Sequence, residues 1–155
     1  MVQTYSDNKY IYSVDMMFAY LYFNKMKPVK LKINDNILKN LEYSGWGDPI
    51  KNIKYSPKQV LENPEKYPED YERIKKADLK YPIIISEDGN IIDGVHRLAK
   101  SVILDKIYIK AYVFNNKLMK KFIIAKRGEW NKVDELKVYQ FIVLYIERFK
   151  ENNIY

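Results

Sequence analysis

The segment 81–114 constrains the fold of this chain more than any other part of the sequence. It opens with a β-branched run over 81–86, which is typical of a buried strand. A turn containing a glycine follows, and a return strand begins at Ile91. The pattern then predicts a helix over 95–104 and a further strand over 107–114. Strands that alternate in this way with a helix predict an α+β fold with a small mixed sheet and packed helices.

Helix caps and periodicity predict the other elements. Ser13 is placed to cap a helix over 13–23. Ser56, Pro57 and Gln59 form the capping-box pattern of a helix start, and that helix must stop before Pro64. The remaining expected elements are a short strand over 29–33, a helix over 68–77, a short helix over 118–125 and a final helix over 133–149.

With 155 residues and no linker or repeat, the chain is expected to form one domain over 1–155. Residues 115–155 are expected to be a helical extension of a core. Its apolar run 141–146 lies on most sides of the predicted helix. We therefore weigh two interpretations of this run as a helix: a homodimer contact through the C-terminal helix, and a buried core helix. A strand is the third alternative, because the run is rich in β-forming residues, but the flanking Glu, Lys and Arg favour a helix.

The composition narrows the function classes. There is no cysteine and only one histidine, which excludes disulfides, thiolate nucleophiles and a structural zinc site. The net charge of +7 favours a polyanionic partner such as a nucleotide, nucleic acid or an anionic surface. The polar N-terminus lacks the apolar core of a signal peptide, and no apolar run is long enough to span a bilayer. We expect a soluble protein with no membrane partner, in the cytoplasm or elsewhere inside the cell.

The segment Asp93 to Arg97 is the candidate site, and His96 is the only histidine. On the helix that begins there, His96, Arg97, Lys100 and Ser101 share one side. Arg97 and Lys100 stand near the positive end of the helix dipole, which disfavours cations by about 0.3–1 kcal/mol unless an anion is bound. Exposed N–H groups, a guanidinium and an ammonium would all face a phosphate, and Gly94 would let the backbone approach it. The predicted phosphate-binding residues are Gly94, His96, Arg97, Lys100 and Ser101.

Each charged residue of this segment has more than one interpretation. Asp93 can cap the helix, hold Mg²⁺ or orient a nucleophile. His96 can act in catalysis or be a hydrogen-bonded structural imidazole. Arg97 can bind phosphate or pair with Asp93 or Asp105.

The turn-rich loop over 43–49 supplies further candidates. Asp48 is a second candidate for a metal ligand or base, although an Asp-Pro turn is the commoner explanation of such a residue. Trp46 can stack on a base or anchor the loop as a buried side chain.

The order of 82–85, the segment Ile91 to Lys100 and the strand 107–113 resembles the ParB/sulfiredoxin superfamily. The resemblance covers residues 29–114 and is most specific over 81–100. It implies that the turn binds a nucleotide (ATP, ADP or CTP), and that Gly94, His96 and Arg97 contact phosphate oxygens. The His-Arg pair resembles the free-serine-kinase branch more than the double arginine of chromosome-partitioning members. Val95 stands where a sulfiredoxin has its catalytic cysteine, so sulfiredoxin activity is excluded.

Three functions follow as hypotheses. The first is an enzyme, a kinase or nucleotide hydrolase, in which Asp93 and His96 are catalytic and Asp93 or Asp48 holds Mg²⁺. The second is a ParB-like nucleic-acid-binding protein or nuclease, since the chain has a net charge of +7 and 15 tyrosines, some of them next to lysines, which can stack on bases and bind phosphates. The third is a nucleotide switch without turnover.

Overall fold

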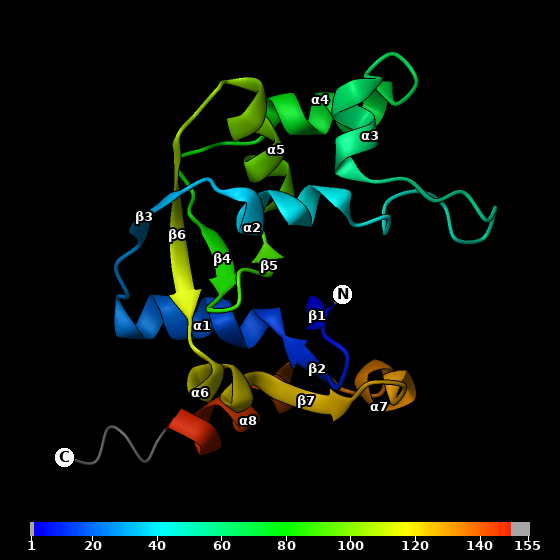
Figure 1. Ribbon diagram of the computed structural model, residues 1–155. Helices are drawn as coiled ribbons and strands as arrows, with labels where there is room; N and C mark the ends of the chain where they lie inside the picture. The colour runs from blue at the N-terminus through cyan, green and yellow to red at the C-terminus, as the bar shows by residue number, and fades with distance from the viewer. Residues whose placement is uncertain (1, 150–155) are drawn as a thin grey trace. The chain divides into compact units, whose positions relative to one another are not determined.

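The computed structural model describes residues 2–149 and has an α+β fold (Figure 1). It contains two compact units, each described here by itself. The central unit comprises Lys27–Phe114, and the second unit combines the first 26 residues with the segment from Asn115 onward. The central unit coincides closely with the predicted core over 29–114. Residues 1 and 150–155 of the predicted domain lie outside the described residues.

A four-stranded sheet forms one layer of the central unit, in the order β3 (Val29–Lys32), β6 (Tyr108–Phe114), β4 (Ile83–Ser86) and β5 (Ile91–Asp93). β4 and β6 are parallel, whereas the other two pairs are antiparallel. The sheet is therefore mixed, which confirms the prediction. A shift in register between Ile84 and Ile85 makes a bulge where β4 meets β5.

Helices pack on one face of this sheet. They are α2 (Asp35–Leu38), the 3₁₀ helix η1 (Lys39–Glu42), α3 (Pro57–Glu62), α4 (Pro68–Lys76) and α5 (Val95–Ile103). The shared core includes Ile83 and Ile85 from β4, Ile74 from α4 and Leu98 from α5. Full burial of each such side chain contributes roughly 1.5–3 kcal/mol, so the core fixes α4 and α5 against the sheet. The site described below is built on those two helices.

The start of α3 follows the predicted capping box. The Ser56 Oγ accepts a hydrogen bond from the Gln59 N–H at 3.2 Å, and the Gln59 side chain accepts one from the Ser56 N–H at 2.9 Å. Pro57 occupies the first helical position, where its missing N–H has no cost. This cap fixes the point at which the preceding loop, residues 45–55, returns to the core.

The second unit contains an antiparallel sheet in the order β1 (Thr4–Ser6), β2 (Tyr10–Ser13) and β7 (Ile123–Lys126). Its helices are α1 (Val14–Asn24), α6 (Asn116–Met119), the 3₁₀ helix η2 (Lys120–Phe122), α7 (Trp130–Asp134) and α8 (Val138–Phe149). Ser13 caps α1 as predicted, because its Oγ accepts the Met16 N–H at 3.1 Å.

Two sequence predictions in this unit are wrong. The expected helix over 118–125 ends at Phe122, and Ile123 begins β7, because this β-branched segment pairs with β2. The expected helix over 133–149 is interrupted. α8 starts anew after Lys137, whose N–H donates to the Gln140 side chain at 2.7 Å. Within residues 2–149, no helix combines the length and the apolar character needed to cross a bilayer.

Candidate functional site

The candidate turn joins β5 to α5. Asp93 is the last residue of β5, and Gly94 is the N-cap of α5 with φ +113°. A Cβ on Gly94 would lie 2.5 Å from the Ile83 Cγ2 and 2.9 Å from a guanidinium nitrogen of Arg97. Glycine is therefore required here by both the backbone angle and the packing. The interpretation of Asp93 as the helix cap is wrong, because no side chain caps this helix.

Arg97 pairs with Asp93. Its Nη2 donates to the Asp93 Oδ2 at 2.7 Å, and the Arg97 side chain is only 18% exposed. The Nε of Arg97 is buried and has no hydrogen-bond partner among the described residues. One of the interpretations drawn from the sequence, an internal ion pair, is thus the observed one, and the Arg97 charge is largely compensated inside the protein.

His96 stacks on Trp46. The ring centroids are 4.7 Å apart and the planes differ by 23°. Its Nε2 is buried and lacks a hydrogen-bond partner within residues 2–149. Burial lowers the pKa of His96 below its usual value of 6.5; Asp70 opposes this shift, and the nearby Arg73 adds to it. The imidazole is consequently neutral at pH 7. In that form one ring nitrogen donates a hydrogen bond and the other accepts one.

Lys100 and Ser101 have other partners. The Lys100 Nζ donates to the Ala77 carbonyl at 2.6 Å, at the C-terminal end of α4. Ser101 is buried, and its hydroxyl donates to the Arg97 carbonyl at 2.9 Å. The structure therefore does not bring these two side chains to the pocket that contains His96.

That pocket has a volume of about 450 Å³. Its walls are the loop 45–55, the first half of α4 and the start of α5. The lining residues are Gly45, Trp46, Gly47, Asp48, Lys51, Ile53, Tyr55, Glu69, Asp70, Arg73 and His96.

The loop wall is held by a small antiparallel bridge. The Trp46 and Tyr55 backbones exchange hydrogen bonds of 3.1 and 3.0 Å. Asp48 accepts the backbone N–H of Ile50 at 2.9 Å and that of Lys51 at 3.4 Å. Asp48 thus organises the turn at the loop tip, as the Asp-Pro interpretation predicted. Trp46 both anchors the loop and lines the pocket.

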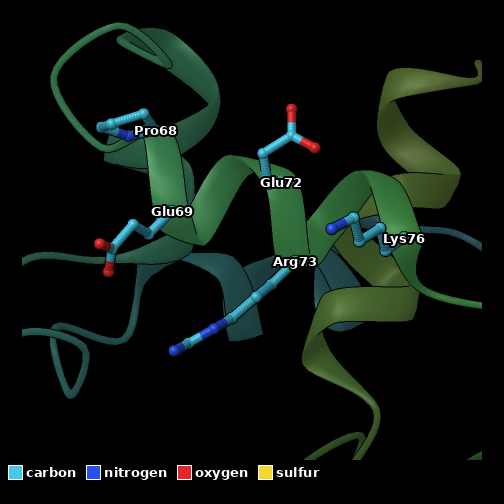
Figure 2. Close-up of a pocket in the computed structure, with 5 residues that line it drawn as sticks. All are labelled: Pro68, Glu69, Glu72, Arg73 and Lys76. Atoms are coloured by element: carbon cyan, nitrogen blue, oxygen red, sulfur yellow. The ribbon is translucent and has the colours of Figure 1, made fainter.

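The α4 wall carries most of the charge. Asp70 accepts a short hydrogen bond from the Tyr55 hydroxyl and lies 3.7 Å from the Arg73 guanidinium. The bond to Asp70 raises the pKa of Tyr55 to about 12, so this hydroxyl stays protonated. Figure 2 shows Glu69 and Arg73 extending from the same side of α4, while Glu72 points away from it. Glu69 and Lys51 form no ion pair within the described part of the chain.

No three carboxylates or imidazoles gather to hold a metal ion among residues 2–149. The two metal candidates are not brought together: Asp48 lines the pocket, whereas Asp93 is absent from its lining. The sequence reasoning missed Lys51, Glu69 and Arg73. The spacing of Glu69 and Arg73, four residues apart on a helix that begins with Pro68, was the available signal, but nothing local showed which surface that helix faces.

Comparison with known proteins gives no information on the function of this site. No protein-family model matches the sequence, and comparisons with curated proteins and with solved structures give no significant match. The function proposed below therefore rests on the geometry of the pocket.

Proposed function

We propose that this chain is a nucleotide-binding protein of ParB/sulfiredoxin-like fold, which holds the nucleotide phosphates in the pocket over the start of α5. The observation that carries the proposal is the convergence of Arg73, Lys51 and His96 on an aromatic-lined pocket of about 450 Å³. Pockets of this size, with a few convergent polar groups, are typical of small-ligand sites.

The phosphate contacts come from three elements. Arg73 reaches in from α4 with a side chain that is 69% exposed, so its remaining N–H groups are available to a ligand. Lys51 approaches from the loop, and His96 from the first turn of α5. The N–H groups of that turn have no side-chain cap, and such groups favour an anion. Trp46 offers aromatic surface for a base.

The partners of the carboxylates that line the pocket determine how strongly they repel a bound polyanion. Asp70 pairs with Arg73 and accepts the Tyr55 hydroxyl, and Asp48 is bonded to backbone N–H groups. Glu69 is the carboxylate without a partner in the described residues. Mg²⁺ is usually held by one or two carboxylates together with substrate phosphates. Glu69 fits that role, with Asp48 as the second carboxylate of the pocket, so the ligand is Mg²⁺-nucleotide rather than the bare anion.

Turnover, as phosphoryl transfer or hydrolysis, would use His96. It is the neutral imidazole of the pocket, and it can accept a proton from a hydroxyl or water. Asp93 would act indirectly in this scheme, because its carboxylate holds Arg97 next to His96. The Mg²⁺ ion would supply charge stabilisation at the phosphate oxygens.

The test is isothermal titration with ATP, ADP, CTP and GTP, with and without Mg²⁺. Arg73→Met should weaken binding of the preferred nucleotide roughly 10- to 100-fold, since hydrogen bonds to charged groups contribute about 1.5–3 kcal/mol. Lys76→Met is the matched control on the same helix, since Lys76 does not line this pocket. Equal affinities for the two variants and the unaltered protein would contradict the proposal. Phosphate release that requires both Mg²⁺ and His96 would establish turnover.

The second candidate function is nucleic-acid binding. The dependence of affinity on salt concentration distinguishes it from nucleotide binding. Lysines already stack on tyrosines within the central unit, for example Lys80 on Tyr81 at 4.9 Å and Lys30 on Tyr108 at 4.4 Å. A polymer held by many phosphates loses affinity steeply with salt, whereas a nucleotide in a pocket responds less. Duplex or single-strand binding with a steep slope, together with no nucleotide binding, would make the nucleic-acid function the correct one.

A further inference from the structure

The two faces of the four-stranded sheet carry different side chains. Leu31 of β3 and Ile109 of β6 are paired on the face that packs against α4 and α5. Successive residues of a strand point to opposite faces, and paired residues point to the same face. The opposite face therefore carries the residues that alternate with this pair. They are Lys30, Lys32, Tyr108 and Lys110, which form what we call the lysine face, and all four are exposed.

The lysine face concentrates positive charge. Lys30 stands directly opposite Lys110, and like charges in that arrangement destabilise a sheet. β3 and β6 contain no acidic residue, and none of the three lysines forms an ion pair within residues 2–149. Lysines on an edge strand commonly prevent the strands of different molecules from pairing. That explanation covers β3 but not Lys110, because β6 lies between β3 and β4.

An aromatic ring lies among these lysines. Tyr108 is 46% exposed, and the Lys30 Nζ lies 4.4 Å from the centroid of its ring. Tyr112, two residues beyond Lys110 on the same face, is half-buried, and its neighbour Ile84 on β4 is buried. The accessible part of this face is therefore confined to β3 and β6. An exposed ring beside ammonium groups is the combination that stacks on a base and binds the adjacent phosphates.

We propose that the lysine face binds single-stranded nucleic acid, with phosphates on the three lysines and an unpaired base on Tyr108. Stacking on an aromatic side chain tolerates any sequence, because every base has a π face. The bases of a duplex are already stacked on one another, so Tyr108 has no base to contact there. We therefore expect a preference for single strands.

The proposal rests on the second candidate function, nucleic-acid binding, and gives that function a location. It does not rest on nucleotide binding, because the nucleotide pocket is built from α4, α5 and the loop 45–55. Those two helices pack on the other face of the sheet. The two sites can therefore be tested separately.

The first test is fluorescence anisotropy with a labelled oligothymidylate of about 12 nucleotides, a length within the usual range for single-strand sites. The Kd should be about 1–100 µM, as for binding without sequence preference. Each phosphate contact contributes about −0.7 to the slope of log affinity against log salt, so three lysines predict a slope of about −2. Lys110→Gln should weaken binding roughly three- to tenfold and change the slope to about −1.4.

Lys76→Gln is the matched control, since it removes the same charge from α4. Its effect should stay below about twofold, because salt screens charges that do not contact the strand. Lys110→Gln should not lower the Tm, because it removes a like-charge pair. Equal affinities and slopes for the two variants would overturn the proposed location.

Substitution of Tyr108 tests the stacking contact. Tyr108→Leu should weaken binding of the single strand about 5- to 150-fold and leave the salt slope unchanged, whereas Tyr108→Phe should retain the affinity within about twofold. A duplex of the same length should bind more weakly and should not respond to Tyr108→Leu. A duplex that binds as tightly as the single strand, with Tyr108→Leu without effect on either, would contradict the single-strand site.

The remaining outcomes separate this proposal from the others. Arg73→Met should leave oligonucleotide affinity unchanged, and Lys110→Gln should leave nucleotide affinity unchanged. Oligonucleotide binding that no substitution in the lysine face alters would overturn the location but keep the nucleic-acid function. No oligonucleotide binding at about 100 µM protein and low salt would overturn both. Binding only to vesicles that contain phosphatidylserine would assign the face to an anionic membrane surface instead.

Discussion

Replacing Gly94 with alanine tests the central claim about the turn between β5 and α5. At φ +113° an alanine lies outside the small left-handed region, and such strain costs about 1–3 kcal/mol. The new Cβ would also lie 2.5 Å from the Ile83 Cγ2, in the core, where overpacking costs about 1–3 kcal/mol more. We therefore expect a loss of about 4 kcal/mol in the free energy of unfolding.

The assay is thermal unfolding followed by tryptophan fluorescence in a Trp130→Phe background, which leaves Trp46 as the only tryptophan and so reports on the central unit. A loss of about 4 kcal/mol corresponds to a decrease in Tm of roughly 15–30 °C for a unit of this size.

Gly89→Ala is the matched control, because Gly89 also has a positive φ, +85°, but its added Cβ meets the movable amide end of Asn36. That control should lose only about 1–2 kcal/mol. Equal losses for the two variants would refute the packing argument.

Three further predictions concern single side chains. Ser56→Ala should lower the free energy of unfolding by about 1 kcal/mol through loss of the α3 cap, as measured by urea denaturation; the exposed Ser44→Ala should not, and equal effects would contradict the capping role. Lys100→Met should lose about 1–2 kcal/mol by removing its hydrogen bond to the Ala77 carbonyl, while nucleotide affinity stays unchanged. If calorimetry shows the reverse, weaker nucleotide binding at an unaltered Tm, Lys100 binds phosphate as the sequence predicted. His96 has a pKa below 6.5 in the folded protein, so the unfolded chain binds the proton more readily, and stability should fall as the pH drops below about 6.5 and level off below the folded pKa. His96→Asn should flatten this part of the curve of Tm against pH; an unchanged curve would show that another group causes it.

Local signals made much of the fold predictable. The capping box at Ser56 and the N-cap at Ser13 involve residues three positions apart, so the sequence alone shows the whole interaction. The strands and the helix between 81 and 114 were predicted to within about two residues for the same reason. The mixed character of the sheet followed from their order.

Contacts between residues far apart in the sequence could not be predicted from local patterns. β2 pairs with β7, so that Ile11 lies opposite Ala125, and neither strand has a strong pattern of its own. The segment after Phe122 therefore looked helical until its partner was known. The pocket shows the same limit: Tyr55 and Asp70 are far apart in sequence, and their bond depends on how α4 packs against the loop 45–55.

The structure also changes the reason for assigning a phosphate site to this turn. From the sequence, Arg97 and Lys100 are cations near the positive end of a helix dipole, and a bound anion would compensate them. Asp93 already compensates Arg97, and the ammonium of Lys100 lies at the C-terminal end of α4, where the dipole favours a cation. Neither cation therefore requires a bound anion. Among residues 2–149, the buried Nε2 of His96 and the buried Nε of Arg97 lack a hydrogen-bond partner, and the first turn of α5 has no side-chain cap. Of these groups, His96 lies near Arg73. The case for an anion therefore rests on Arg73 from α4, which is why its replacement, rather than that of Arg97, decides the proposal.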